Sequence, residues 1–338
     1  MEKFSLDREW KFFNGDIKIP ETGTHTDYYM ASKAGGARGA ASPDFDKSNW
    51  ETVNIPHDWA VYNKFEEKWG PSQGYKARGK GWYSKRFRLD ESDRGKQILI
   101  EFEGISTYSA IYLNGSVIGR NFCGYNSFTV DATDMAVYGE DINDLVVFVD
   151  ATAVEGWWYE GAGIYRHVNL YKKNQLHIAH WGVFVHPEKK SADVWDAITE
   201  TTIENTSYET KEFILKSYIL DAENNVVGKD EKSFTVDGGD TAEIRQNILT
   251  YSPLLWDIDT PNLYRMVSEL YEGETLTDKQ VNTFGFRTIE IDPDNGFFLN
   301  GRRVPLYGTC NHQDHAGVGV AVPDSVNEYR IKLLKEMG

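Results

Sequence analysis

Hydrophobic and polar residues follow one another in short runs over the first half of the chain, as they do in β-strands. In the clearest run, Ile98, Ile100 and Phe102 occupy every second position, which is the period of a strand. A second apolar run, at 110–113, leads into Asn114-Gly115, the dipeptide favoured in two-residue hairpin turns. We therefore predict a β-hairpin within residues 97–119.

Residues 1–173 contain no run with a convincing helical period. The run 145–149 is entirely apolar, as expected for a central strand that is covered on both faces. Short strands over a region of this size predict one β-sandwich, for which a jelly roll is the usual solution.

A second series of strand-like runs begins after the polar break at 172–174. The expected strands lie at 176–186, 198–205, 213–220, 233–236 and 263–271. Asn224-Asn225 and Gly238-Gly239 supply turns between them. Five or more strands in this length predict a small immunoglobulin-like β-sandwich over 174–287.

The pattern changes in the last segment, 288–338. Asn300-Gly301 between two apolar runs predicts one more hairpin, and 307–310 is expected to continue as a strand. Residues 324–337 predict an amphipathic helix with a capping box formed by Ser325 and Glu328. Because such a helix needs a sheet to cover its apolar stripe, we expect this βα unit to open an α/β domain. The alternative is that the helix packs back onto a sandwich as a terminal cap.

Composition narrows the classes of function. Hydrophobic residues make up 40% and aromatic residues 14%, which indicates a globular protein. The formal net charge of −16 disfavours nucleic acid and anionic membranes as partners, because both need clustered Lys and Arg. A neutral ligand suits the chain better. The ten Trp and nineteen Tyr include candidates for stacking on sugars, although most are expected in the cores.

The two cysteines, Cys123 and Cys310, lie outside any CxxC or Cys/His metal spacing. We therefore expect free thiols, no metal site and no cofactor. No apolar run reaches the ~18 residues that span a bilayer, and residues 1–10 lack the apolar core of a signal peptide. The compartment stays open: cytoplasmic, or periplasmic or extracellular if a signal peptide has been removed.

Several strings of residues stand in a fixed order over nearly the whole chain. They are IPHDW at 55–59, GWY at 81–83, FEG at 102–104, YLNG at 112–115, GYNSF at 124–128, WYEGAGIYR at 158–166, FGFR at 284–287, GFFLNG at 296–301 and GTCNH at 308–312. Together they resemble glycoside hydrolase family 2, whose members join a jelly-roll sugar-binding domain, an immunoglobulin-like domain and a TIM barrel. The resemblance implies three domains: a jelly roll at 1–173, an immunoglobulin-like sandwich at 174–287 and the start of an incomplete TIM barrel at 288–338.

The segment that begins at Asn311 carries the candidate site. In the resembled family it leaves the C-terminal end of the first barrel strand, where TIM barrels place functional groups. The resemblance implies that His312 contacts substrate hydroxyls and that Asn311 and Asp314 shape the pocket rim. Trp158 is a further candidate, as a stacking face, with its neighbour Trp157 as the alternative, although residues 155–157 depart from the family pattern. The charged loop 64–80 is a candidate for the rim of the barrel mouth.

His57-Asp58 invites a catalytic interpretation, but the pair has no evident nucleophile. We predict that these two residues form a structural turn.

The resemblance also implies a retaining mechanism with two catalytic Glu residues. The acid/base of the family follows an Asn, whereas Asn327-Glu328 lies on the expected helix. We therefore expect no catalytic residue in this chain: both catalytic Glu would lie beyond residue 338, and the chain alone would be inactive. The segment 311–319 looks most like β-galactosidases, so a parent enzyme cleaving terminal β-galactosides is expected.

Four alternatives stay open. The parent enzyme is a β-glucuronidase or a β-mannosidase of the same family, or the chain is a non-catalytic carbohydrate-binding protein, or a structural surface protein of stacked β-domains. Carbohydrate is the expected ligand, and the resemblance implies a homo-oligomer formed through the β-domains. The incomplete barrel is expected to leave apolar surface exposed on Val326, Leu333, Leu334 and Met337, so that some association of this chain would be artificial.

Overall fold

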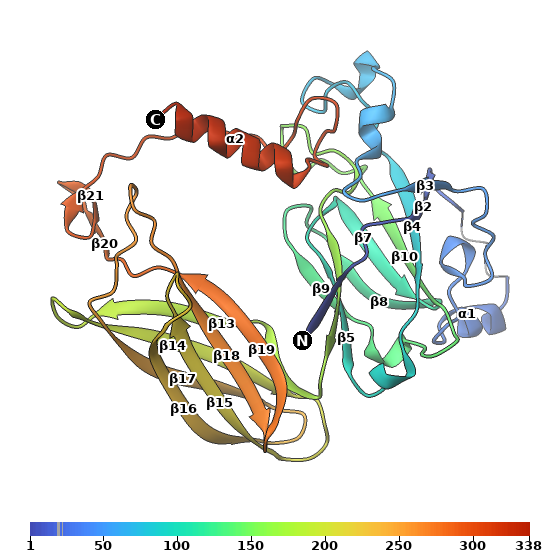
Figure 1. The fold of residues 1–338 in the computed structure, drawn as a ribbon. Helices are drawn as coiled ribbons and strands as arrows, with labels where there is room; N and C mark the ends of the chain where they lie inside the picture. The colour runs from blue at the N-terminus through green and yellow to red at the C-terminus, as the bar shows by residue number, and fades with distance from the viewer. Residues whose placement is uncertain (19–20, 22) are drawn as a thin grey trace. The chain divides into compact units, whose positions relative to one another are not determined.

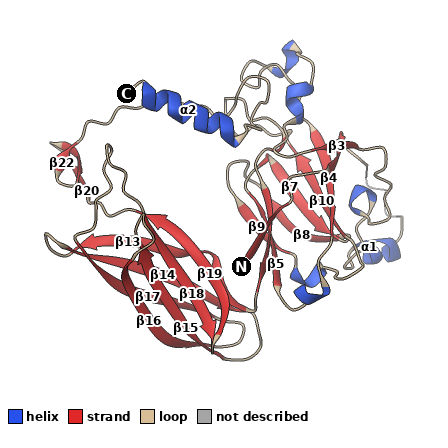
Figure 2. Ribbon diagram, viewed as in Figure 1, coloured by secondary structure: helices blue, strands red, loops and turns tan. Residues whose placement is uncertain are grey.

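The computed structural model describes residues 1–18, 21 and 23–338. They form two compact units: unit 1 comprises Met1 and Lys173–Cys310, and unit 2 comprises Glu2–Lys172 and Asn311–Gly338. Strands dominate both units, which confirms the expected mainly β fold class (Figure 2). Within the described chain, neither helix has the length and hydropathy needed to cross a bilayer.

Unit 2 contains a β-sandwich drawn from the first half of the chain (Figure 1). Its strands are β1 (Glu2–Ser5), β2 (Trp10–Asn14), β3 (Glu51–Val53), β4 (Lys80–Phe87), β5 (Gln97–Phe102), β6 (Ile105–Ser106), β7 (Tyr108–Leu113), β8 (Ser116–Asn121), β9 (Phe128–Asp131), β10 (Asn143–Asp150), β11 (Gly163–Ile164) and β12 (Val168–Lys173). One sheet has the order β1-β12-β5-β9, a second has the order β3-β2-β4-β10-β7-β8, and β11 pairs with β6.

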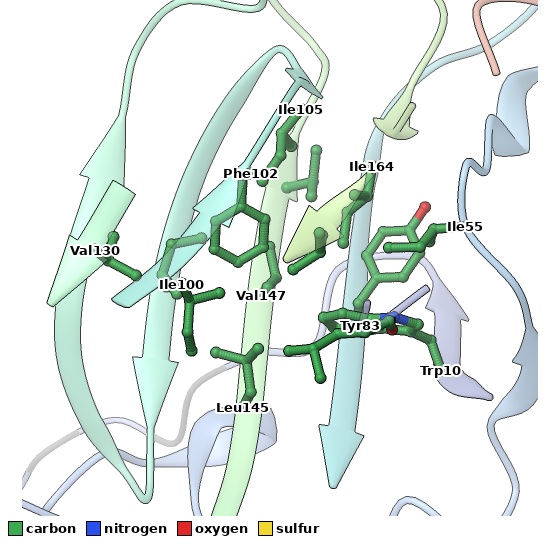
Figure 3. Packing of buried hydrophobic residues seen from close by; sticks show 14 of the residues in the cluster. Trp10, Ile55, Tyr83, Ile100, Phe102, Ile105, Val130, Leu145, Val147 and Ile164 are labelled. Atoms are coloured by element: carbon green, nitrogen blue, oxygen red, sulfur yellow. The ribbon is translucent and has the colours of Figure 1, made fainter. Parts of the chain in front are cut away.

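The core of this sandwich lies between its two large sheets. Figure 3 shows Ile100 and Phe102 of β5 pointing toward Leu145 and Val147 of β10, and all four side chains are fully buried. Burying such a side chain stabilises the fold by about 1.5–3 kcal/mol. The outer face of β5 is covered as well: Glu101, which is 5% exposed, accepts hydrogen bonds from neighbouring β12.

The expected hairpin within 97–119 is confirmed as β7 and β8. Asn114 and Gly115 both have positive φ, 50° and 76°, as a two-residue hairpin turn of this type requires. A Cβ at Gly115 would also fall 2.7 Å from the carbonyl oxygen of Gly35, so the turn has no room for a side chain.

Two kinds of helix, neither of them predicted from the sequence, occur in unit 2 before the last segment. Helix α1 (His25–Ala31) is held by a capping box between Thr24 and Asp27. Seven residues are too few to display a helical period, which is why the pattern missed it. The short 3-10 helices are η1 (Gly39–Ala41), η2 (Trp59–Tyr62), η3 (Glu67–Trp69), η4 (Glu91–Asp93) and η5 (Thr133–Met135).

Unit 1 is a second β-sandwich. Its strands are β13 (Leu176–Lys189), β14 (Val194–Asn205), β15 (Lys211–Leu220), β16 (Val226–Val236), β17 (Thr241–Tyr251), β18 (Tyr264–Glu272) and β19 (Thr275–Phe284). A sheet β13-β14-β17 faces a sheet β16-β15-β18-β19, the three-plus-four division of an immunoglobulin-like sandwich. Phe213 and Leu215 anchor one part of the core, and Trp195 and Phe286 anchor the other.

The hairpin expected after residue 287 is confirmed. Strands β20 (Ile289–Asp292), β21 (Gly296–Leu299) and β22 (Arg302–Arg303) form a small sheet, with Asn300 and Gly301 at the turn. The expectation that 307–310 continues as a strand was wrong. These four residues have no strand conformation, because no strand among the described residues lies beside them to accept and donate the ladder hydrogen bonds.

The expected terminal helix is confirmed as α2 (Asp324–Glu336), but its expected capping box is not formed. The helix begins one residue before Ser325, so Pro323 occupies the N-cap position and makes no side-chain cap. No residue of α2 is buried, and Leu333 and Met337 are 40% and 81% exposed. The apolar stripe therefore has no sheet against it within the described residues.

Candidate functional site

A buried carboxylate, Glu160, organises the loop that follows β10. Its Oε2 forms an ion pair with Arg78 at 3.0 Å, and the two side chains are only 2% and 5% exposed. Oε1 accepts hydrogen bonds from the Tyr125 hydroxyl at 2.8 Å and from the backbone N–H groups of Glu155 and Gly156 at 3.0 and 2.8 Å. Because a buried carboxylate is tolerated only when its oxygens are paired, this network fixes the course of residues 155–160.

Two tryptophans follow each other in this loop and differ in exposure. Trp158 is half-buried: its indole N–H donates to the Tyr125 hydroxyl at 3.0 Å, and its carbonyl accepts from Gln73 at 2.7 Å. Trp157 is 82% exposed and meets the Trp158 ring edge-on. Trp158, the candidate from sequence, is thus held by the loop, and its neighbour presents the open aromatic face.

The expectation of a structural turn at His57-Asp58 is confirmed. Asp58 accepts from the Ala60 N–H at 3.0 Å and so caps η2. Burial lowers the pKa of His57 to about 4, which leaves its imidazole neutral at physiological pH. Its Nδ1 lies 2.8 Å from the Tyr83 hydroxyl, and its ring packs against Phe12.

Asp58 also contacts the last segment of the chain. Its Oδ2 accepts from the Tyr159 hydroxyl at 2.8 Å and from the Val320 N–H at 3.1 Å, while Oδ1 accepts from the Ala162 N–H at 3.0 Å. One carboxylate therefore joins the turn after residue 57, the loop before β11 and the segment that carries the candidate site.

That segment folds into a turn held by Arg330 of α2. The guanidinium donates to the carbonyls of His312 and Asp314 at 3.2 and 2.6 Å and to Nδ1 of His315 at 2.8 Å. The His312 side chain is exposed, as is that of Asn311, whereas Asp314 is partly buried. Arg330 thus holds two carbonyls of the turn, and the His312 imidazole is exposed.

A pocket of about 270 Å³ lies where this segment meets the loop 61–76. Its wall includes Phe65 and Lys76 of the loop, Tyr159, and Asp314 and His315 of the last segment. Of the four candidates from sequence, the structure therefore places only Asp314 in this wall. The other three, Asn311, His312 and Trp158, lie close to it in sequence but outside it.

Polar groups around the pocket are held by local contacts. Lys76 donates to the carbonyls of Val61 and Asn63, and its ammonium lies 4.1 Å from the centre of the Phe65 ring. Burial, followed by the charge of Asp58, raises the pKa of Tyr159, so its hydroxyl remains a donor. The described residues contain no group of three His, Cys, Asp or Glu side chains that could hold a metal ion.

Sequence reasoning missed the residues that assemble this region. Tyr159 and Glu160 stand in the string at 158–166, but no local spacing marks their contacts with Asp58 and Arg78, which lie 101 and 82 residues away. Arg330 bonds the turn that lies 15–18 residues before it, and no spacing marks it either. Gly161 and Gly319, each followed by an apolar residue, are a further signal in the sequence. Both have positive φ, which marks places where the backbone approaches a neighbour closely.

Most of the chain matches domains of one known protein family. Residues 5–174 match the sugar binding domain of glycosyl hydrolases family 2, and residues 176–287 match a further domain of glycosyl hydrolases family 2. The chain belongs to glycosyl hydrolase family 2. The two matched ranges cover the two sandwiches. The family is therefore established by these two domains, without the residues that are expected to begin the barrel.

Family 2 proteins with named activities are similar to most of this chain. A protein of Bacteroides ovatus named β-galactosidase BoGH2A is 36% identical over 304 residues, which is 88% of this chain and 35% of that protein. A protein of Formosa agariphila named β-glucuronidase is 29% identical over 321 residues, or 87% of this chain and 33% of that protein. The chain thus spans about a third of the length of these relatives.

A solved structure agrees with the fold. The crystal structure of a family 2 member from Bacteroides cellulosilyticus matches this chain with a TM-score of 0.86 and 31% sequence identity. The match covers 100% of this chain and 44% of the chain from Bacteroides cellulosilyticus. The two relatives with named activities are a β-galactosidase and a β-glucuronidase, which act on different sugars. Family membership alone therefore does not identify the sugar.

Proposed function

We propose that this chain is the N-terminal portion of a retaining glycoside hydrolase that cleaves terminal β-galactosides. Family membership supports a glycosidase, and the relative from Bacteroides ovatus that carries the name β-galactosidase is 36% identical. In such enzymes two carboxylates ~5–5.5 Å apart act as acid/base and nucleophile. We place both beyond residue 338, so that this chain contributes substrate contacts and no catalytic residue.

The proposed domain division follows from the same reasoning. Residues 1–173 form the jelly-roll sugar-binding domain, 174–287 the immunoglobulin-like domain and 288–338 the beginning of a TIM barrel. In the complete barrel, the exposed stripe of α2 would be covered.

Within the proposed site, His312 binds substrate hydroxyls, because a neutral imidazole both donates and accepts. Asn311 and Asp314 shape the rim. The observation that supports this assignment is the turn at 312–315: Arg330 donates to the carbonyls of His312 and Asp314, the His312 side chain is exposed, and Asp314 lies in the wall of the pocket. Trp158 is assigned to the rim through the loop that Glu160 holds.

Activity measurements test the proposal directly. The purified 338-residue chain is expected to release no nitrophenol from a nitrophenyl β-galactoside above a buffer blank. The parent protein is expected to cleave the galactoside with a higher kcat/KM than the matching glucuronide and mannoside. A preference for the glucuronide would replace the galactosidase assignment with the β-glucuronidase alternative.

A substitution tests the role of His312. In the parent protein, His312→Ala is expected to raise KM for the galactoside by about 5- to 50-fold, the loss of one or two hydrogen bonds to substrate. His25→Ala is the control, because His25 is an exposed imidazole at the start of α1. Equal KM values in the two variants would remove His312 from the site.

One observation favours a second candidate, a non-catalytic carbohydrate-binding protein. The indole of Trp157 is 82% exposed and held beside Trp158, an arrangement suited to stacking on a sugar ring. This function predicts that the isolated chain binds galactose or an oligosaccharide in titration calorimetry and that Trp157→Ala abolishes the heat of binding.

Self-association through α2 is expected to be detectable in the isolated chain, because Leu333, Leu334 and Met337 are exposed.

A further inference from the structure

The carboxylate of Asp58 occupies an unusual position for a charged group. It is 2% exposed, and no Lys or Arg forms an ion pair with it among the described residues. Four donors surround it instead: the N–H groups of Ala60, Ala162 and Val320 and the hydroxyl of Tyr159, all between 2.8 and 3.1 Å. Two donors point at each oxygen, so the hydrogen-bonding capacity of the carboxylate is well used.

This environment carries a cost that the donors offset. Burial raises the pKa of Asp58, and the hydrogen bonds from Tyr159, Val320, Ala162 and Ala60 act in the opposite direction. A buried charged group persists only where the surrounding structure supplies such partners. If the Val320 N–H moved away, the carboxylate would lose one of the two donors on Oδ2 and retain the full cost of burial.

The backbone around the carboxylate is shaped to let it approach. Gly161 and Gly319 have φ of 63° and 60°, and a Cβ on either residue would overlap Oδ2 of Asp58. Gly319 belongs to the last segment and Gly161 to the loop before β11. Both segments therefore lack side chains at the two places where they pass the carboxylate.

The other polar contacts between the last segment and the sandwich are more exposed. Gln313 donates to the carbonyl of Tyr159 at 3.2 Å, and His167 lies 3.1 Å from Asp324, both at the surface. Exposed polar contacts of this kind contribute little, because water competes for the same groups. Asp58 is thus the buried polar contact of this attachment, and it lies 262 residues from Val320 in sequence.

We propose that Asp58 is a positioning residue that fixes the segment 311–322 to the jelly roll and thereby sets the place of His312 and Asp314. The carboxylate acts as an acceptor that binds the Val320 N–H and orients the Tyr159 hydroxyl. It neither touches substrate nor exchanges a proton. Attachment of the segment follows from the geometry alone, whereas its effect on substrate binding rests on the proposed function.

Hydrogen exchange on the purified 338-residue chain tests the attachment. Asp58→Asn keeps the shape of the side chain but turns an N–H₂ group toward two of the four donors. Peptides that cover 315–322 are expected to exchange about 10- to 100-fold faster than in the unchanged chain, as expected for the loss of one hydrogen bond to a charged group. Asp144→Asn is the control: Asp144 is a buried carboxylate of the same sandwich that pairs with Lys47 and Ser84.

A second pair of variants avoids changing the sandwich. Gly319→Ala and Gly317→Ala both place a side chain at positive φ, 60° and 86°, in the same segment. The new methyl group overlaps Asp58 only in Gly319→Ala and meets nothing within 4 Å in Gly317→Ala. Gly319→Ala is expected to accelerate exchange at 315–322 at least tenfold more than Gly317→Ala, with the exchange of β5 and β10 unchanged in both.

These outcomes decide the proposal. Faster exchange confined to 315–322 in Asp58→Asn and Gly319→Ala supports it. Exchange in this segment that matches the two controls, or that is already unprotected in the unchanged chain, overturns it. In the parent protein, Asp58→Asn is expected to raise KM more than it lowers kcat; an inactive parent would refute the proposed function and leave the exchange result standing.

Discussion

Removing the charge of Glu160 is expected to destabilise unit 2 more than any other single change in the loop 155–160. In Glu160→Gln the side chain keeps its size, but Arg78 is left as a buried cation without its carboxylate. The amide also turns an N–H₂ group toward donors from Tyr125, Glu155 and Gly156. Both effects act in the same direction.

The magnitude follows from the burial of the pair. Breaking a buried ion pair by removing one partner costs about 3–5 kcal/mol, because the remaining charge stays desolvated. With the two side chains only 2% and 5% exposed, solvent cannot screen the loss. For a unit of this size, 1 kcal/mol corresponds to about 2–4 °C in Tm, so the unfolding transition of unit 2 is expected to fall by roughly 6–20 °C.

Differential scanning calorimetry of the 338-residue chain provides the measurement, with tryptophan emission reporting on the loop. The control is Glu140→Gln, which removes the carboxylate of an exposed ion pair with Arg88 in the same unit. Exposed pairs contribute at most about 1 kcal/mol, so this variant is expected to stay within a few degrees of the unchanged chain. A Glu160→Gln transition that coincides with that of Glu140→Gln would refute the reasoning.

Two further outcomes are expected. Burial lowers the pKa of His167, but hydrogen bonds to Asp7 and Asp324 outweigh it and raise the pKa above its usual value. The resulting stabilisation is full below about pH 6.5 and is lost as the pH rises through the raised pKa. The protection factors of amides at the start of α2, which are exchange rates corrected for intrinsic pH dependence, are therefore expected to fall there and to become independent of pH in His167→Gln. Phe102→Ala and Phe286→Ala should each cost about 3–5 kcal/mol, the first in the transition of unit 2 and the second in that of unit 1; calorimetry in which either variant shifts both transitions equally would contradict independent cores.

Local patterns predicted much of the fold because strands and turns are encoded by near neighbours. The alternation at Ile98 and Ile100 and the turn at Asn114-Gly115 depend on residues within a few positions of each other. Helix α1 escaped because Thr24 and Asp27 cap a helix too short to show a period. The strand expected at 307–310 failed because a strand also needs a neighbour, which no local pattern supplies.

The candidate site was less accessible to sequence reasoning. His312 and Asp314 were found through family resemblance, and only Asp314 lies in the wall of the pocket. Asp58 was correctly expected in a turn, yet its second contact, with Val320, joins residues 262 positions apart. Such a contact is specified by the meeting of two folded segments, and a single sequence contains no local trace of it beyond the glycines that make room.

Because unit 2 is interrupted in sequence by Lys173–Cys310, its two pieces leave the ribosome at different times. The sandwich of Glu2–Lys172 emerges before the Val320 N–H that binds Asp58 in the complete unit. At typical synthesis rates the missing donor arrives on the order of ten seconds later. During that interval Oδ2 of Asp58 has one of its two protein donors, the Tyr159 hydroxyl, and it gains the second once the stretch around Gly319 has been made.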